Sequence, residues 1–227
     1  MTEENKLITE RKKKLDAIKV NNKAYPNTFR KKDYANNISG KYGDLEKEDI
    51  AEKNIPVSIA GRLLTIRNMG NSSFANLHDE SGNIQIYLQK KQVGEDSYAL
   101  FNNLDLGDIV GIEGVLFKTR TGELTINTSS IMLLSKSLRP LPEKFHGIAD
   151  IEIKYRQRYL DLMINPETKS LFKTRSKIVS QIRNFFIEDD YLEVETPMMH
   201  MIPGGAAAKP FVTHHNSLDL DLYLRIA

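Results

Sequence analysis

The sequence feature that most constrains the fold is a change in hydrophobic spacing at Pro56. Before this residue apolar side chains recur at helical intervals, and after it they alternate with polar ones. The apolar residues Val57, Ile59 and Leu63 alternate with Ser58, Ala60 and Arg62. Successive side chains of a strand point to opposite faces, so this alternation predicts half-buried β-strands from Pro56 onward.

Five strands are expected between Pro56 and Leu138. Their expected ranges are Pro56–Leu63, Phe74–His78, Ile84–Gln89, Ile109–Phe117 and Leu124–Leu134. Turn residues at 79–83 and 119–123 predict two hairpins, and 97–103 has a helical pattern. Gly61 predicts a bulge or bend in the first strand. Three strands, a helix and two strands are typical of the five-stranded OB barrel.

The segment before the barrel, 1–55, is expected to be a helical extension. Leu7, Ile8, Leu15 and Ile18 predict an amphipathic helix that ends before Pro26. Residues 36–43 have a loop pattern, and 45–53 predict a short acidic helix. The domains are therefore expected at 1–55, 56–138 and 139–227.

The third region begins at a stiff linker, Leu138–Pro142, whose prolines disfavour helix and central strand. Tyr155, Tyr159 and Leu162 are expected on one helix. Asn165-Pro166 predicts the cap and start of a longer helix with a broad apolar stripe. Leu218–Ile226 alternates like a strand, but the chain supplies no obvious partner, so an exposed edge is expected. The fold class is α+β.

Composition excludes several classes of protein. Hydrophobic residues make up 40% of the sequence, net charge is +2, and cysteine is absent. These values predict a soluble, cytoplasmic protein without disulfides, membrane spans or thiolate metal sites. The basic run 11–14 is interpreted mainly as a solvated helix face, with phosphate binding as the alternative.

Other candidate sites carry weaker signals. His214 and His215 are adjacent, so on a strand they point to opposite faces and cannot chelate one metal together. The small-residue run 202–208 lacks a Walker lysine and predicts only a tight turn. No nucleophile–base pair stands out, so no catalytic residue and no metal ligand is predicted.

The second and third strands carry the main binding signal. Their apolar residues must face the core, which places Phe74 and Tyr87 on the outer face among Asn and Gln side chains. An outward ring can stack on a base, which contributes about 1–3 kcal/mol, and amides can read its edge. The alternative, that Phe74 is capped by the N-terminal segment or turned inward, has equal weight from pattern alone.

Three stretches of the sequence are specific enough to indicate a family. They are Arg139–Gly147, Tyr155–Leu162, and Pro203–Ala227 with its Pro-Gly-Gly-Ala and Thr-His-His-Asn runs. With them, the chain resembles the N-terminal part of the bacterial lysyl-tRNA synthetase family, of class II, over essentially its whole length. Aspartyl and asparaginyl enzymes share the barrel and the Tyr-Leu-Asp-Leu element.

The resemblance implies roles for individual residues. Phe74 would stack on an anticodon uridine, and Gln85, Arg67 and Glu123 would contact uracil edges. Gly204 and Gly205 match the loop that approaches the lysine substrate. The run from Glu193 to Pro197 resembles class II motif 1, which would place Pro197 at a homodimer interface. Asp190 stands where the family usually has Gly, and Ala207 where it often has a polar residue.

The resemblance also implies the overall activity and partners. The complete enzyme would be a lysine–tRNA ligase that uses ATP and Mg2+ in protein biosynthesis, with tRNA(Lys) but neither DNA nor membrane as partner. Residues that bind ATP and Mg2+ would follow Ala227, in motifs 2 and 3. This chain is therefore expected to bind the anticodon and to begin a class II antiparallel-sheet catalytic domain, without activity alone. The alternative is a stand-alone tRNA- or RNA-binding OB module without catalysis.

Overall fold

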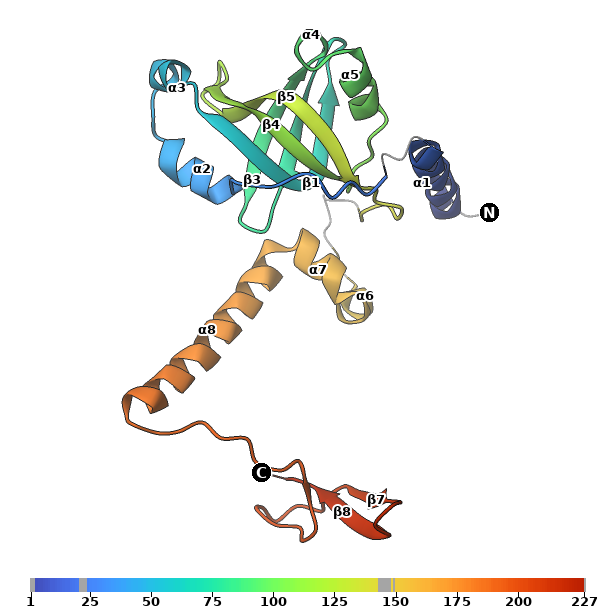
Figure 1. Ribbon diagram of the computed structural model, residues 1–227, viewed down its shortest axis with the longest axis vertical. Coiled ribbons are helices and arrows are strands. Elements are labelled where there is room, and N and C mark those ends of the chain that lie inside the picture. Colours follow the sequence, from blue (N-terminus) through green and yellow to red (C-terminus); the bar gives the residue numbers. More distant parts are fainter. Residues whose placement is uncertain (1–2, 21–23, 143–147, 149, 227) are drawn as a thin grey trace. The chain divides into compact units, whose positions relative to one another are not determined.

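The computed structural model describes residues 3–20, 24–142, 148 and 150–226. The chain divides into two units, Met1–His146 and Gly147–Ala227, each described here by itself. The first unit contains the barrel and the helices that precede and interrupt it (Figure 1). Residues 143–147 of the family-specific stretch at 139–147 lie outside the described residues. The predicted domain limits at 55 and 138 stay predictions.

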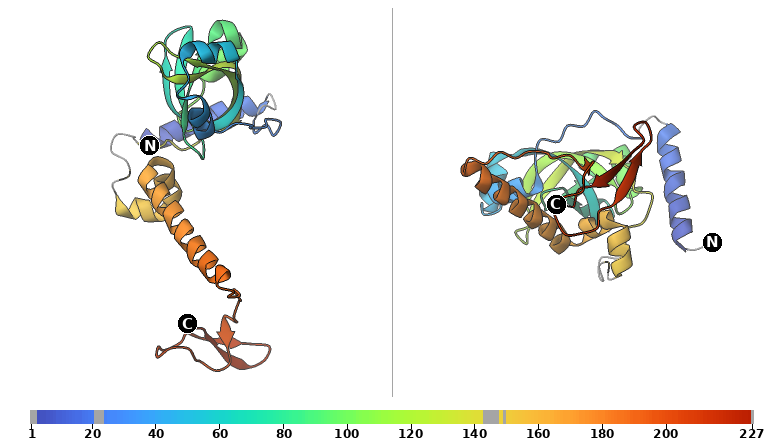
Figure 2. Two further views of the ribbon diagram at one scale, coloured as in Figure 1. Left: turned by 90° about the vertical axis from the view of Figure 1, so that its left-hand side faces the viewer. Right: turned by 90° about the horizontal axis from the view of Figure 1, so that it is seen from below.

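The predicted five-stranded barrel is confirmed. Its strands are β1 (Pro56–Asn68), β2 (Ser72–His78), β3 (Asn83–Gln89), β4 (Ile109–Lys118) and β5 (Leu124–Ser135). The order β1-β2-β3-β5-β4 closes on itself because β1 also pairs with β4. All pairs are antiparallel except β3 with β5, and Figure 2 shows the closed wall from two further sides.

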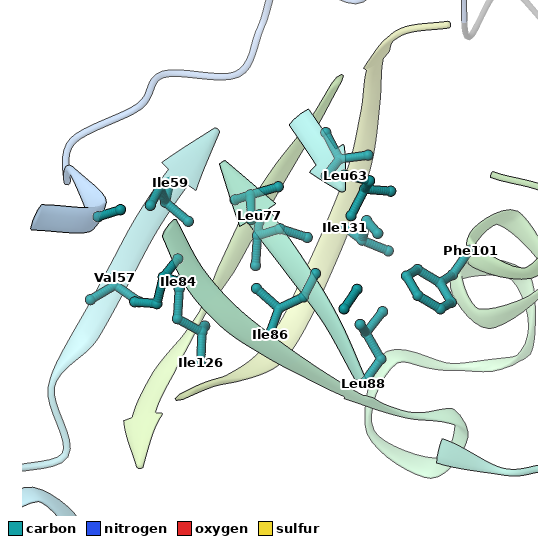
Figure 3. Close-up of a cluster of buried hydrophobic side chains, with 14 of the residues drawn as sticks. Val57, Ile59, Leu63, Leu77, Ile84, Ile86, Leu88, Phe101, Ile126 and Ile131 are labelled. Atoms are coloured by element: carbon teal, nitrogen blue, oxygen red, sulfur yellow. The ribbon is translucent and has the colours of Figure 1, made fainter. Parts of the chain in front are cut away.

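The barrel core is filled by the inward residues of all five strands. Ile59, Leu63, Leu77, Ile86 and Ile126 are all fully buried, and Figure 3 shows them meeting at the centre. Each side chain of this size contributes about 1.5–3 kcal/mol when it leaves water. The alternation seen in the sequence is therefore the alternation between core and outer face.

Two short helices, α4 (Lys90–Val93) and α5 (Glu95–Asn102), follow β3. Figure 1 shows them at one end of the barrel. Phe101 of α5 is 1% exposed and joins the core cluster. The helix predicted at 97–103 is thus confirmed, and it begins earlier than the pattern suggested.

The bulge in β1 lies beyond Gly61. The register with β2 shifts between Leu63 and Thr65. A Cβ at Gly61 would lie 2.6 Å from the backbone oxygen of His78. Gly61 is therefore required by a close approach of two strands, whereas the bulge itself re-aims the side chains from Thr65 onward.

The helix α1 (Glu3–Val20) is confirmed, and it is fixed to the rest of its unit by side chains of its basic run. Arg11 donates hydrogen bonds of 3.0 and 3.1 Å to the backbone oxygens of Ser137 and Arg139. Lys14 lies 2.7 Å from Asp105. Arg11 and Lys14 thus make internal contacts, while Lys12 and Lys13 are exposed.

The loop expected at 36–43 is wrong, because Ala35–Tyr42 forms helix α2, followed by α3 (Lys47–Lys53). Ala35 and Ile38 are buried in the barrel's core cluster. Eight residues with only two buried positions give a weak periodic signal. Packing against the barrel, which sequence spacing does not report, stabilises the helix.

Asp79 attaches α2 to the turn between β2 and β3. Its carboxylate accepts hydrogen bonds from the backbone N–H groups of Ala35, Ser81 and Gly82, and Lys31 lies 3.0 Å away. Burial disfavours the charged form, but these hydrogen bonds outweigh it and hold the pKa of Asp79 far below its ordinary value. The folded arrangement therefore stabilises the charged form of Asp79.

The second unit begins with three helices, α6 (Ile151–Arg156), α7 (Arg158–Ile164) and α8 (Pro166–Glu188). The single helix expected for Tyr155, Tyr159 and Leu162 is wrong, because the backbone breaks at Gln157. Asn165 stands at the start of α8 as predicted, yet its side chain makes no cap bond. It donates instead to Asp161, 2.6 Å away.

Asp161 is the buried polar centre of these helices. Burial raises its pKa, but hydrogen bonds from Asn165 and Thr168 and the charge of Arg158 prevail, so the pKa of Asp161 lies below its ordinary value. The carboxylate joins the Tyr-Leu-Asp-Leu element to the first turn of α8. No residue of α8 itself is buried.

The expected unpaired edge at Leu218–Ile226 is also wrong. The strand β8 (Leu220–Leu224) is the central strand of a three-stranded antiparallel sheet, between β6 (Met199–His200) and β7 (Val212–His215). The two partners have only two and four residues, so their alternation is too short to predict the pairing. No described helix is long and apolar enough to cross a membrane.

Candidate nucleic-acid interface

The outer face of the β1–β2–β3 sheet brings three of the predicted anticodon residues into neighbouring rows. Backbone register places Arg67 of β1 opposite Phe74 of β2, and Phe74 opposite Tyr87 of β3. The next row pairs Asn76 with Gln85. Neighbouring strands lie about 4.8 Å apart, so these side chains share one continuous surface.

An aromatic row crosses this surface. The ring centroids of Phe74 and Tyr87 are 4.6 Å apart at an interplanar angle of 33°, and those of Tyr87 and Phe117 are 5.9 Å apart at 55°. All three side chains are half-buried. Ala75 and Leu77 point into the core instead. The structure thus excludes the alternative in which Phe74 turns inward, and it places the half-buried Phe74 ring on the outer face, as base stacking requires.

Gln85 and Glu123 meet although 38 residues separate them in the chain. The amide nitrogen of Gln85 donates a 2.8 Å hydrogen bond to the carboxylate of Glu123. Its amide oxygen accepts a 2.9 Å bond from the hydroxyl of Thr125. Since Thr125 is fully buried, it fixes which end of the Gln85 amide faces outward.

The position of Glu123 depends on the turn between β4 and β5. The backbone N–H of Thr119 donates to the oxygen of Glu123, and the N–H of Glu123 donates back to the Thr119 hydroxyl. Gly122 has a φ of 85°, a conformation that glycine adopts at no steric cost. This turn holds Glu123 beside β3.

A pocket of about 350 Å³ lies at the Gln85 end of the face. It is mostly polar, and Ser39 of α2 contributes to its wall. Its polar lining consists of Ser39, Asn76, Asn83, Gln85 and Glu123. The volume lies at the lower end of the range for small-ligand pockets, about 300–1,000 Å³. A hydrogen-bond donor and an acceptor at one pocket can read a base edge that offers both.

Arg67 lies near the end of β1 and is exposed. It makes no ion pair within the described residues, so its guanidinium can reach a base carbonyl or a phosphate. The structure therefore brings Arg67, Phe74, Gln85 and Glu123 to one side of the barrel. Their roles with RNA stay predictions.

Several residues of this interface were missed in the sequence. Phe117 and Thr125 reach it because β5 pairs with β4, its neighbour in the chain, and with β3, which lies much earlier in the chain. Ser39 reaches it because 35–42 is a helix. Outward parity on β4 could have indicated Phe117, but no local signal indicates the parallel pairing that places Thr125 under Gln85.

The second unit places its predicted site residues in exposed segments. Gly204 and Gly205 lie in the loop between β6 and β7, and Gly205 has a φ of 100°. Pro197 follows a stretch without regular structure, and its backbone oxygen lies 2.9 Å from the His200 ring. Arg183 of α8 contacts Glu193 at 2.7 Å, and the hydrogen bond favours the charged forms, lowering the pKa of Glu193.

His214 is engaged within its own sheet, with its Nδ1 atom 2.8 Å from Asp221 on β8. No group of three or more potential ligands among the described residues could hold a metal ion.

Comparisons with known proteins agree with both units. The family model described as OB-fold nucleic acid binding domain matches residues 57–134. The model described as tRNA synthetases class II (D, K and N) matches residues 150–227. By fold and by these matches, the chain joins an OB-fold nucleic-acid-binding domain to the start of a class II tRNA synthetase domain.

Lysine–tRNA ligases from several bacteria are similar to this chain. The chain is 54% identical over 225 residues to a lysine–tRNA ligase of Nitrosomonas europaea, and 55% and 54% identical to those of Thiobacillus denitrificans and Neisseria meningitidis. Each match covers 99% of this chain and 45% of the relative. The chain thus corresponds to the N-terminal portion of the lysine–tRNA ligases, and it spans just under half of their length.

Proposed function

We propose that this chain reads the anticodon of tRNA(Lys) as part of a lysine–tRNA ligase. The observation that carries the proposal is the joint outer surface of Phe74, Gln85 and Glu123. A ring for stacking lies one row from a donor and an acceptor that hydrogen-bond to each other. In the free protein these two groups satisfy one another, and a base edge would replace that bond.

The chemistry of the pair suits uracil. Uracil presents two carbonyl acceptors with an N–H donor between them. The Gln85 amide nitrogen supplies a donor, and the Glu123 carboxylate supplies an acceptor for the N–H. Arg67 adds a second donor at the open end of β1. Cytosine lacks the ring N–H, so it would leave the Glu123 carboxylate without that partner.

Binding is tested with an RNA stem-loop that carries a UUU anticodon. Phe74→Ala is expected to weaken binding by about 1–3 kcal/mol, the usual contribution of one stacked base. Tyr25→Ala is the matched control, because Tyr25 is an exposed aromatic outside the barrel strands. Equal affinity of Phe74→Ala and the unaltered protein, measured by fluorescence anisotropy, would refute the assignment.

We further propose that the longer protein activates lysine with ATP and Mg2+ and transfers it to tRNA. Its contribution to the chemistry would be positioning of substrates and stabilisation of phosphate charge. The ATP and Mg2+ contacts are assigned to residues that follow Ala227 in the longer relatives. We therefore expect no lysine-dependent ATP–pyrophosphate exchange from these 227 residues; detectable exchange would contradict this expectation.

The second unit is proposed to contribute two features to the ligase. The loop with Gly204 and Gly205 would approach the lysine substrate, since neither residue has a side chain to obstruct it. The segment at Pro197, with α8, would form a homodimer interface. The exposed Ile178, Ile182 and Phe185 lie on one side of α8 and support this, because an apolar helix face requires a cover.

The alternative function is a stand-alone RNA-binding module. The barrel is closed and has its own core within the first unit, which supports independent folding of that unit. Anticodon binding without dimerisation, detected by sedimentation of the isolated chain, would favour this alternative over the dimeric ligase.

A further inference from the structure

A second pocket, of about 630 Å³, lies at the end of the β2–β3 hairpin opposite to Gln85. Its walls come from the outward residues Ser72, Tyr87 and Gln89 and from Lys90 and Lys91 of α4. Asn71 and Glu95 complete the lining. Most of these side chains are polar, and two are cationic. Apart from Tyr87, whose ring packs against Phe74, none of them has a role in the anticodon reading proposed above.

The two pockets lie on one track along the hairpin. Asn76 and Gln85 form one row, Phe74 and Tyr87 the next, and Ser72 and Gln89 the third. Rows on one face are two residues apart, or about 6.6 Å. One nucleotide of an extended strand spans a comparable step. A strand whose base stacks on Phe74 would therefore place a neighbouring nucleotide at the second pocket.

Tyr87 belongs to both parts of the track. Its ring packs against Phe74, and its hydroxyl accepts a 2.8 Å hydrogen bond from the Gln89 side chain. The aromatic row thus continues directly into the wall of the second pocket.

The pocket has one uncompensated positive charge. Lys90 lies 2.9 Å from Glu95, so these two charges compensate each other. Lys91 is exposed and makes no ion pair with any described residue. An ammonium group in this position attracts a phosphate rather than a neutral base.

The pocket is preformed by backbone contacts. The N–H of Lys90 donates a 2.9 Å hydrogen bond to the oxygen of Asn71. The buried Tyr98 of α5 donates through its hydroxyl to the oxygen of Gly70, 2.8 Å away. These bonds fix the β1–β2 loop and α4 against each other, so a ligand need not order the walls.

We propose that this second pocket binds the sugar–phosphate of the nucleotide that adjoins the stacked anticodon base, with Lys91 neutralising the phosphate. Gln89 and Ser72 supply hydrogen-bonding groups for the ribose or phosphate oxygens. The proposal rests on the anticodon reading described under Proposed function. It adds a contact that does not depend on base identity and that extends the interface by one nucleotide.

The test compares Lys91→Ala with Lys53→Ala, an equal loss of charge on α3, away from this pocket. Affinity is measured against salt for single-stranded RNA containing UUU. One lost phosphate contact on a single strand reduces the slope of log K against log salt by about 0.7. Between about 50 and 200 mM salt, the unaltered protein should lose roughly 2.6-fold more affinity than Lys91→Ala. Lys53→Ala should retain the full slope.

RNA length locates the contact. Oligonucleotides are extended by one nucleotide on either side of UUU. One of the two extensions should raise the affinity of the unaltered protein, and Lys91→Ala should lose this gain whatever base is added. Inorganic phosphate, added at constant ionic strength, serves as the free anion for comparison. It should not produce the gain in RNA affinity that the added nucleotide produces.

The outcomes separate this inference from the proposed function. An unchanged salt slope in Lys91→Ala overturns the proposal that the second pocket binds a phosphate. Weaker binding by Phe74→Ala would still support anticodon reading in that case. If Lys91→Ala leaves the salt slope unchanged and Phe74→Ala leaves the affinity unchanged, both the phosphate contact and the anticodon reading are overturned. Lys91 is exposed and alanine suits a helix, so Lys91→Ala should fold, and circular dichroism checks that it does.

Discussion

The side-chain amide of Gln85 donates a 2.8 Å hydrogen bond to the carboxylate of Glu123, which lies in the turn between two other strands. Thr125 holds the opposite end of the same amide. A buried hydroxyl thus sets the orientation of Gln85, and Glu123 lies beside the end of the amide that would meet a base edge. The protein holds a donor and an acceptor ready before any ligand arrives, which reduces the entropy cost of binding.

Glu123→Ala should weaken binding of a UUU stem-loop by about 1.5–3 kcal/mol, the usual contribution of a hydrogen bond to a charged group. The loss should be smaller for a stem-loop with cytidine in the anticodon, because cytosine lacks the ring N–H. Fluorescence anisotropy with the two RNAs measures the difference. Glu113→Ala, an exposed carboxylate on β4, is the control, and an equal loss in both RNAs would argue against base reading by Glu123.

Asp79→Asn should destabilise the barrel unit by about 1.5–3 kcal/mol at neutral pH, since the charged form accepts the hydrogen bonds from Ala35 and Ser81. The folded pKa of Asp79 lies below its ordinary value of 3.8. The carboxylate therefore contributes its full stability above about pH 4, and the contribution falls as pH drops toward the folded pKa.

Denaturant unfolding at a series of pH values checks this behaviour. The difference in unfolding free energy between the unaltered protein and Asp79→Asn should be constant near neutrality and shrink below about pH 4. A difference that does not change with pH would show that the effect of the substitution is steric rather than electrostatic.

Gly61→Ala should destabilise the barrel by about 1–3 kcal/mol, the usual cost of overpacking. The new methyl group would lie 2.6 Å from the His78 backbone oxygen, which belongs to a paired strand and cannot move alone. Gly40→Ala in α2 meets nothing within 4 Å, so it should be neutral or stabilising. Thermal unfolding of the two variants separates them; equal melting temperatures would contradict the close approach at Gly61.

Arg11→Ala should release α1 from the barrel, whereas Lys12→Ala should not. Arg11 donates to two backbone oxygens near the end of β5, and it is 9% exposed. Its removal takes away both of these hydrogen bonds, at a cost of about 1.5–3 kcal/mol, and the Arg139 oxygen keeps only the one from the Ser137 hydroxyl. Hydrogen exchange of α1 amides should accelerate in Arg11→Ala alone. Equal exchange in both variants would mean that Leu15 holds the helix without Arg11.

Much of the barrel could be predicted because buried and outward residues alternate along its strands, and this alternation is visible in the sequence. Leu77 and Ile86 alternate with outward residues, and the turn residues between them mark the hairpin. The N-terminal helix and α8 were predicted for a similar reason, since helical spacing of apolar residues is a local property. The outward position of Phe74 follows from the same parity.

The errors occurred where particular contacts, and not hydrophobic periodicity, decide the structure. Helix α2 forms because Ala35 and Ile38 find a place on the barrel. Strand β8 acquires partners on both sides from segments that alternate too briefly to be recognised. The break at Gln157 depends on the network around Asp161. None of these contacts leaves a periodic signal.

The sequence by itself thus determined the barrel, the outward face of its second and third strands, and a family resemblance that the comparisons with lysine–tRNA ligases confirm. The tertiary structure alone decided that Glu123 and Thr125 lie at the two ends of the Gln85 amide. It also decided that Tyr87 leads to a pocket with Lys91. The physical reason is range: side-chain parity is fixed within a few residues, whereas the pairing of β3 with β5 joins segments about 40 residues apart.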